Sequence, residues 1–585
     1  MSITRTRGGA HVVSAVCAAL LLLAPICRAD APLVVVVDGV EGEVRDNVLG
    51  YLAIVQNRDQ DLSDAEIAAL HRRAPGEIRA ALEPFGYYRP EIDASLEDID
   101  GDGWRARYRI DPGTPVPVGT VDIELLDDAS DDPAFARLLD QLPLREGVPL
   151  RHADYDRSRD ALRRLAAERG YFDARFTRRE LRIDLDEYVA EARLTLDAGR
   201  RYRFGRIRFD QEVLDEALLR RYLPFREGDP YLAGRLLELQ TALTASNYYE
   251  LVSVAPRTAE AEDGEVPIDV VLTTRPSQHY TLSGGYGTDT GVRTRAGWEW
   301  RPVNRLGHAL SASLELAEFR QGAKVRYSLP MDDPRDERLD FTGSLSEEQS
   351  DTTFSRIAQV GSAMHLGDER FRYILSLDYK REESRTGGER QQADLVIPGI
   401  STSFVRAENV LRVESGYRLD ASVHGGSELL GSDVSFGQFR AFGKHILTPL
   451  ARLRLLARWE VGTTWTDDFE RLPVSERFYA GGDQSIRGYA WRSLGPKNDA
   501  GKVVGGPHLV VASIEVERYF DENWGGALFL DGGNAFDDAP DDLVAGAGIG
   551  LRWRTPIGAV RVDLAKALDS DDNDWRLHLQ LGPDL

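Results

Sequence analysis

Cysteine is nearly absent from this sequence, and the positions of its cysteines exclude two kinds of site. The 585 residues include two cysteines, Cys17 and Cys27, and both lie within the first 31 residues. If that segment is removed, no thiol remains in the chain. We therefore expect neither a disulfide framework nor a metal held by thiolates.

Long hydrophobic runs are also absent after the first segment. That segment begins with arginines, continues as an apolar run from Val12 to Ile26 and ends in small residues. This order is typical of a secretory signal peptide, which we predict over residues 1–31, with cleavage after Ala29 or Ala31. No later stretch offers the run of about 18 or more apolar residues that a membrane-spanning helix needs, so the exported chain is either soluble or a membrane β-barrel.

Acidic side chains outnumber basic ones, and catalytic motifs are scarce. The formal net charge of -24 argues against a nucleic-acid partner, which would need a basic face. No G-x-S-x-G motif occurs, and the ten histidines are scattered along the chain. The stretch "DIDGDG" (98–103) resembles half of a calcium loop, but Arg109 stands where a bidentate acid is needed. We expect no enzyme, no cofactor and no metal.

The first half of the chain contains a repeated unit. The stretches "FGYYRPEIDASL" (85–96), "RGYFDARFTRREL" (169–181) and "SNYYELVSVAPR" (246–257) each place a Gly or Asn and two aromatics between a helical and a strand pattern. A helical face over Val44, Val48, Leu52 and Val55 lies in the first unit. The order strand, helix, helix, strand, strand predicts three α+β domains, at 32–113, 114–200 and 201–277.

The helical period disappears near residue 278, and short alternating segments follow. In "ALSASLEL" (309–316) and "VRVDL" (560–564), apolar side chains alternate with polar ones. Repetition of this pattern to the end predicts a sixteen-stranded transmembrane β-barrel over 278–585, with water on one face and lipid on the other. A soluble sandwich also buries one face, but it rarely needs so many long strands.

Eleven predicted strands precede the stretch "RFYAGGDQSIRGYAWRSLGP" (477–496), and five follow it. The same alternation turns Glu515 and Asp531 toward the lumen, since Ile514 and Leu530 belong to the apolar face. Arg487 is then within reach of either acid, and which one holds it stays open. An ordinary mobile outer loop is the alternative.

Glycines beside this arginine fit a loop that folds inward. Gly488 would let the backbone pass close to the barrel wall, where Tyr489 would pack, and Gly481 and Gly482 lie earlier in the same loop. We predict that this loop, about residues 470–507, acts as a latch inside the barrel.

The first and last strands form a weak junction in this prediction. The closing strand, Trp575 to Leu581, has seven residues, against about 9–11 for a full crossing. The first strand contains Gly284 and Gly285, which weaken a strand. We expect a lateral seam here that can open, although glycines near barrel ends also serve curvature alone.

Three such domains, sixteen strands and an Arg-Gly-aromatic motif in the sixth outer loop resemble the BamA/TamA outer-membrane assembly superfamily, over essentially the whole mature chain. "RFYAGGDQSIRGY" and the terminal "LGPDL" are most similar to its TamA branch. The resemblance implies three periplasmic POTRA domains, a barrel in the outer membrane, and a loop whose arginine contacts acids on the inner wall. The chain departs from outer-membrane barrels that end in Phe or Trp, because it ends in Leu585.

The resemblance also implies a function and partners. It implies a factor that helps insert or secrete barrel proteins, autotransporters in particular, with a TamB-like inner-membrane-anchored partner at the POTRA domains. Unfolded outer-membrane proteins are the implied clients, and the lipid bilayer is the implied surroundings, with a part in lipid traffic. The alternative is a two-partner-secretion pore for a dedicated exoprotein. Such transporters have two repeats after a plug helix, for which the sequence offers no candidate before Leu33.

Overall fold

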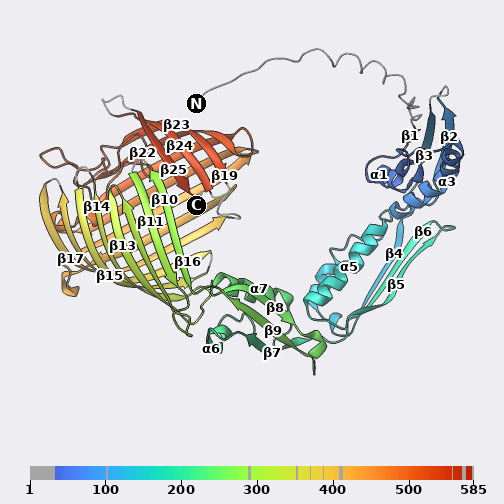
Figure 1. Cartoon of the computed structure of the whole chain (residues 1–585), viewed down its shortest axis with the longest axis horizontal. Helices are drawn as coiled ribbons and strands as arrows, with labels where there is room; N and C mark the ends of the chain where they lie inside the picture. The colour runs from blue at the N-terminus through green and yellow to red at the C-terminus, as the bar shows by residue number, and fades with distance from the viewer. Residues whose placement is uncertain are drawn as a thin grey trace, which may run out of the picture. The chain divides into compact units, whose positions relative to one another are not determined.

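The computed structural model describes residues 33–99, 103–287, 291–350, 353–368, 370–386, 388–407, 413–555, 558–569 and 575–582. The predicted signal peptide lies outside the described residues. Three small α+β domains precede one sixteen-stranded antiparallel sheet, which confirms the predicted fold class (Figure 1). Within the described ranges, no helix has both the length and the apolar character needed to cross a membrane.

Each N-terminal domain has a three-stranded sheet whose last strand in sequence lies in the middle. The first domain contains β1 (Leu33–Asp38), α1 (Gly42–Tyr51), α2 (Ala53–Gln56), α3 (Asp64–Leu82), β2 (Glu91–Asp98) and β3 (Trp104–Asp111). The second contains β4 (Val118–Leu126), α4 (Pro133–Leu139), α5 (His152–Glu168), β5 (Arg175–Asp184) and β6 (Val189–Asp197). The third contains β7 (Arg203–Asp210), α6 (Glu216–Arg220), α7 (Ala233–Ala245), β8 (Tyr249–Pro256) and β9 (Glu265–Thr274).

One predicted helical face is divided in the structure. Val44 and Val48 lie on α1, but the chain becomes extended at Leu52, and Val55 follows on α2. This break lets Leu52 and Ile54 both become fully buried in the core of the first domain, which a continuous helix would not place on one side.

The repeated Gly or Asn has a shared backbone conformation. Gly86, Gly170 and Asn247 have φ angles of 87°, 85° and 60°, which lie in the left-handed region. A helix commonly ends with such a residue, and Gly and Asn adopt it at the least cost. The repeat therefore marks the point where each domain turns from its second main helix into its sheet.

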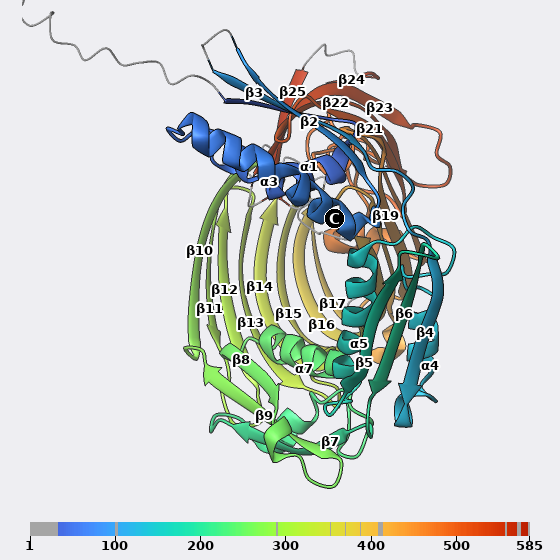
Figure 2. The same cartoon turned by 90° about the vertical axis from the view of Figure 1, so that its right-hand side faces the viewer.

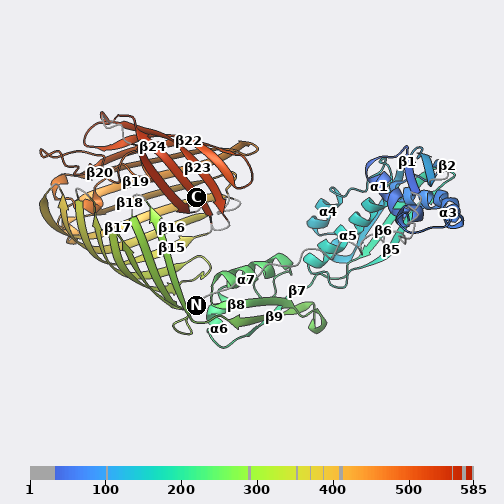
Figure 3. The ribbon, with the colours of Figure 1, turned by 45° about the horizontal axis from the view of Figure 1, so that its top comes forward.

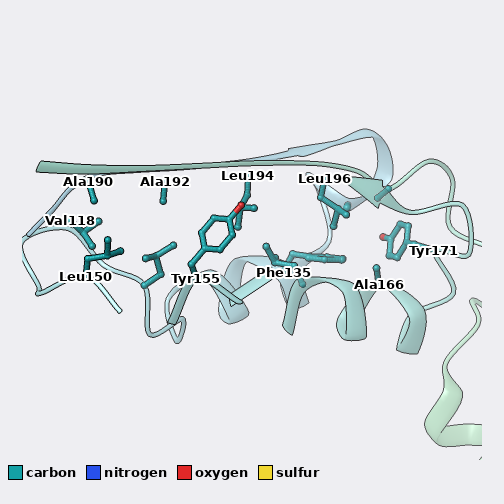
Figure 4. Packing of buried hydrophobic residues seen from close by; sticks show 14 of the residues in the cluster. Val118, Phe135, Leu150, Tyr155, Ala166, Tyr171, Ala190, Ala192, Leu194 and Leu196 are labelled. Atoms are coloured by element: carbon teal, nitrogen blue, oxygen red, sulfur yellow. The ribbon is translucent and has the colours of Figure 1, made fainter. Parts of the chain in front are cut away.

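The core of the second domain forms between the helices and β6. Alternate residues of β6 point toward α5 and are buried, and two of them are alanines, Ala190 and Ala192 (Figure 4). Tyr155 lies beside Ala192 and Leu194, and Phe135 lies opposite Leu194 and Leu196, so large side chains from the helices fill the core below the strand. In the third domain, α7 covers β8 and β9 in the same way (Figure 3).

The large sheet follows chain order without a crossover from β10 to β25, and Figure 2 shows its first strands as one curved wall. Eleven strands precede the Arg487 loop and five follow it, as predicted. The strands are β10 (Gln278–Gly287), β11 (Gly291–Trp300), β12 (Ala309–Ala317), β13 (Arg320–Pro330), β14 (Arg338–Gln349), β15 (Thr353–Gly367), β16 (Phe371–Thr386), β17 (Glu389–Ala407), β18 (Gly416–Gly426), β19 (Phe436–Leu450), β20 (Leu453–Thr466), β21 (His508–Tyr519), β22 (Trp524–Phe536), β23 (Val544–Thr555), β24 (Gly558–Ala567) and β25 (Trp575–Gly582).

The sheet ends at β10 and β25. Among the described residues, no hydrogen-bonded ladder joins these two strands, and β25 pairs with β24 alone. The closing strand has eight residues, one more than predicted, because its pairing with β24 continues to Gly582. It is still the shortest strand of the sheet.

Part of the third domain belongs to the same compact unit as the barrel. The Asp215 carboxylate accepts a hydrogen bond from Arg305 Nε at 2.8 Å, and Arg335 lies 3.1 Å from Glu238 on α7. Tyr248 donates its hydroxyl to the Gly307 carbonyl at 2.5 Å. These contacts attach α6, α7 and the start of β8 to the turns at one end of the barrel.

Candidate functional site

The loop between β20 and β21, residues 467–507, contacts the inner face of the barrel. We call it the lumen loop. In β21 and β22 the apolar side chains of Ile514, Leu528 and Leu530 are exposed on the outer face, and the alternate residues are buried. Arg487 is only 5% exposed because its guanidinium lies among those alternate residues.

Arg487 binds three carboxylates at once. Its Nε and Nη2 donate to the two oxygens of Asp531 at 2.7 and 2.9 Å, in a bidentate geometry. Its Nη1 donates to Glu515 Oε2 at 2.8 Å and to Asp563 Oδ2 at 2.9 Å. The Arg487 backbone N–H also donates to Asp531, at 3.0 Å. Glu515 and Asp531, the two acids predicted from the sequence, both bind Arg487, and so does Asp563, which was not predicted.

The strand alternation already contained the signal for the third acid. In "VRVDL", Val562 and Leu564 belong to the outer face, so Asp563 must point inward with Glu515 and Asp531. Alternation does not give the position of Asp563 along the barrel axis. That position follows from the register between β23 and β24, in which Gly550 lies opposite Asp563.

Two arginines of the wall complete the cluster. Arg552, on β23, donates to Glu515 Oε1 at 2.6 Å, to Glu517 Oε1 at 3.0 Å and to Asp563 Oδ1 at 2.6 Å. Arg454, on β20, forms an ion pair with Glu517. Burial by itself lowers the pKa of Arg487, but the neighbouring carboxylates outweigh it and raise that pKa above its ordinary value, so the guanidinium is charged.

Glycines make room for the loop against this wall. Gly488 has a φ of +98°, and a Cβ there would lie 2.7 Å from the Ala567 backbone nitrogen. On β23, a Cβ at Gly546 would lie 2.0 Å from the Arg487 carbonyl oxygen. The backbone of the loop therefore touches the strands directly, which only glycine permits at these positions.

The remaining named loop residues surround this contact. Gly481 and Gly482 have φ angles of +97° and +106° and form the turn that precedes Arg487. A Cβ at Gly481 would lie 2.4 Å from the Ala490 carbonyl oxygen, so the turn is also closely packed. Tyr489 packs beside a buried apolar cluster that includes Phe478 and Ile486.

The lumen loop also holds the inner face of the last strand. The Gly488 N–H donates to His578 Nε2 at 3.0 Å, while His578 Nδ1 contacts the Asp483 carboxylate. Gln580 Nε2 donates to the Asp483 carbonyl at 2.7 Å. His578 was not predicted as a site residue. Its inward direction follows from alternation, because Trp575 and Leu577 lie on the outer face.

The predicted seam residues lie on the two strands that end the sheet. Gly284 and Gly285 are on β10, and Trp575 and Leu581 are on β25 with their side chains exposed on the outer face. A cavity of about 430 Å³ beside the lumen loop is lined by Tyr286 of β10 and by Leu581 of β25. The space next to the loop thus reaches both edges of the sheet.

Comparison with known sequences matches three segments of the chain. Residues 304–584 match the Omp85 superfamily domain, residues 34–112 match the POTRA domain described as TamA domain 1, and residues 202–275 match the surface antigen variable number repeat.

Curated relatives and one solved structure extend these matches. The outer membrane protein assembly factor BamA of Nitratidesulfovibrio vulgaris is 23% identical over 552 residues, which cover 88% of this chain and 68% of that protein. BamA of Neorickettsia risticii is 22% identical over 435 residues, covering 67% of this chain and 55% of that protein. The crystal structure of Haemophilus ducreyi BamA lacking POTRA domains 1–3 has a TM-score of 0.68 at 18% identity, covering 79% of this chain and 99% of that one; it supports the fold.

Replacing Arg487 tests whether the buried cluster stabilises the barrel. Arg487→Ala removes the bidentate partner of Asp531 and leaves Glu515 and Asp563 with Arg552 alone, so we expect a loss of about 3–5 kcal/mol in the free energy of unfolding. Lys502→Ala removes an exposed positive charge from the same loop and should change stability by less than about 0.5 kcal/mol. Urea unfolding in detergent micelles, followed by heat-modifiable gel mobility, measures both. Equal midpoints for the two variants would contradict a stabilising role.

Replacing Gly488 tests the close approach of backbone to wall. Gly488→Ala and Gly501→Ala both put a side chain on a left-handed residue, which costs about 1–2 kcal/mol in either case. A Cβ at Gly501 meets no atom within 4 Å, whereas one at Gly488 collides with Lys566 and Ala567. We therefore expect Gly488→Ala to expose the loop to protease and Gly501→Ala to leave it protected, and equal protection in both would show that the contact is not needed.

Proposed function

The chain belongs to the Omp85 superfamily, and from that membership we propose that it is an assembly factor that helps client proteins into or across the outer membrane. Its barrel lies in the outer membrane, and its POTRA domains lie in the periplasm. The observation that carries the proposal is the lumen loop, which is bonded both to a buried charge cluster and to a terminal strand that has one paired edge.

The seam between β10 and β25 provides the strand edges that the proposed mechanism uses. A strand edge presents unpaired N–H and C=O groups, and an incoming extended segment satisfies them by adding a strand. β25 has eight residues against about 9–11 for a full crossing, and Gly284 and Gly285 weaken β10. Separating these two strands therefore breaks few interactions, and a client strand can pair with either edge.

The lumen loop acts as a latch in this mechanism. Arg487 connects it to β21, β22 and β24, and the Asp483 and Gly488 contacts connect it to β25. A shift of the loop then changes the support of the closing strand from inside. Its role is to stabilise one conformation of the barrel, since its charged group is already satisfied by the wall.

The POTRA domains provide the periplasmic binding surface. Each three-stranded sheet has two edge strands at which an extended segment of a partner or client can pair. A TamB-like inner-membrane-anchored protein is the partner we propose here, with autotransporter-type barrels as clients and a share in lipid transport. The match of residues 34–112 to TamA domain 1 supports this narrower assignment.

A disulfide across the seam tests lateral opening. Tyr286→Cys with Leu581→Cys puts one thiol on each of the two strands that end the sheet, at positions that line the same cavity, and non-reducing gel mobility shows whether the cross-link has formed. We expect the oxidised double variant to lose client assembly by at least tenfold and to regain it on reduction, while each single variant stays active. Full activity of the locked protein would rule out opening at this seam.

Deletion of the gene separates an assembly factor from a dedicated secretion pore. We expect the outer-membrane proteome of the deletion strain to lose several barrel or autotransporter proteins together, measured by quantitative mass spectrometry. Loss of a single secreted protein, with the barrels unchanged, would favour the pore instead. Complementation with the Lys502→Ala variant is the matched control, and Arg487→Ala should complement poorly.

A further inference from the structure

A second buried ion pair holds the lumen loop to another part of the wall. Glu476 lies on the loop in a short 3₁₀ helix, residues Val474–Glu476, and is 5% exposed. One of its carboxylate oxygens contacts the ammonium of Lys380 on β16, and the other lies 2.9 Å from His424 Nε2 on β18. Lys380 is 8% exposed, so both charges of the pair are withdrawn from water.

Neighbouring contacts position Glu476 through its main chain. Gln438 of β19 donates its amide to the Glu476 carbonyl oxygen at 2.8 Å and is itself fixed to Thr464 at 2.8 Å. Ser475 donates both its N–H and its hydroxyl to Glu382 of β16, at 3.2 and 2.5 Å. The segment before Arg487 is thus bound to three strands of the wall, β16, β18 and β19.

The two anchors are close in sequence and opposite in charge. Glu476 precedes Arg487 by eleven residues. The carboxylate of Glu476 lies against β16 and β18, while the guanidinium of Arg487 lies against β21, β22 and β24. Between them, Ala480 and Ile486 are buried, so the segment is also packed at points between the two anchors.

We propose that Glu476 is a second positioning residue of the lumen loop, and that its pair with Lys380 keeps the loop stretched across the lumen independently of Arg487. Neither anchor suffices alone, because each fixes one end of the segment 476–487. Exchanging the charges of residues 476 and 487 would place a positive side chain beside Lys380 and a negative one beside the carboxylates that now bind Arg487. The two anchors together therefore also specify which end of the segment contacts which strands.

Cysteine labelling of the loop tests this proposal. Both native cysteines lie in the predicted signal peptide, so Ala480→Cys gives the mature chain a single, buried thiol. In that background we expect Glu476→Gln to raise the rate of maleimide labelling at least about tenfold, since it removes the carboxylate that Lys380 contacts. Glu470→Gln makes the same chemical change at an exposed position of the same loop and should label at the parent rate.

A double-variant series separates the anchors. Lys380→Met with Glu476→Gln removes both members of one pair, so labelling should be no faster than with Glu476→Gln alone. Arg487→Ala with Glu476→Gln removes both anchors, and labelling should exceed that of either single variant. Heat-modifiable mobility, measured on every variant, should remain that of a folded barrel, so that faster labelling reports release of the loop.

Two results would overturn the proposal. One is a labelling rate in Glu476→Gln equal to that in Glu470→Gln, which would mean that Arg487 alone holds the loop. The other is a rate in the Glu476→Gln, Arg487→Ala double variant no higher than in Arg487→Ala, which would mean that the anchors do not act separately. The assay contains no client, so it can fail while the proposed assembly function stands, and the seam disulfide tests that function separately.

Discussion

The guanidinium of Arg487, buried against three carboxylates, is the interaction on which the interior of the barrel depends. Asp531, Glu515 and Asp563 belong to three different strands, and one side chain from a loop binds all three. Arginine suits this position because its planar group donates in several fixed directions and stays charged when buried. Lysine would offer one point charge and could not reproduce the bidentate contact with Asp531.

Because it is buried, this interaction specifies the position of the lumen loop more than it increases the net stability of the barrel. Charges withdrawn from water lose hydration, and only complete pairing restores it, so a buried cluster adds little over an apolar core but strongly penalises any misplaced partner. The lumen loop therefore has one arrangement in which Arg487 and Glu476 are both satisfied. Gly488 and Gly546 also help to define this arrangement, since they let the loop backbone come close enough to the strands for Arg487 to reach the carboxylates.

The closing strand connects this cluster with the seam. β25 pairs with β24 along one edge, and its inner face is held by the lumen loop through His578 and Gln580. For a strand this short, support from a loop replaces part of the support that a second neighbouring strand would give. The position of the loop and the position of β25 are consequently linked through the same few hydrogen bonds.

The inward direction of each strand residue could be predicted from alternation, because a strand with lipid on one side and water on the other must keep a period of two. That rule placed Glu515 and Asp531 on the lumen side, and applied to β24 and β25 it would also have placed Asp563 and His578 there. Alternation does not predict which acids lie at the same level along the barrel axis as Arg487. That level depends on the register between neighbouring strands, which is known only from the paired sheet.

The sequence by itself determined the three repeats, the number of strands, the lumen face of each strand and the loop that carries the arginine. Each of these follows from local periodicity or from residues that few other types can replace, such as Gly86, Gly170 and Asn247 at left-handed turns. Only the tertiary structure decided that Glu476 meets Lys380 and that Gly488 meets His578, which lie 96 and 90 residues apart in sequence. Contacts of that separation arise because the sheet curves around the loop, and no local pattern encodes which strands the loop reaches.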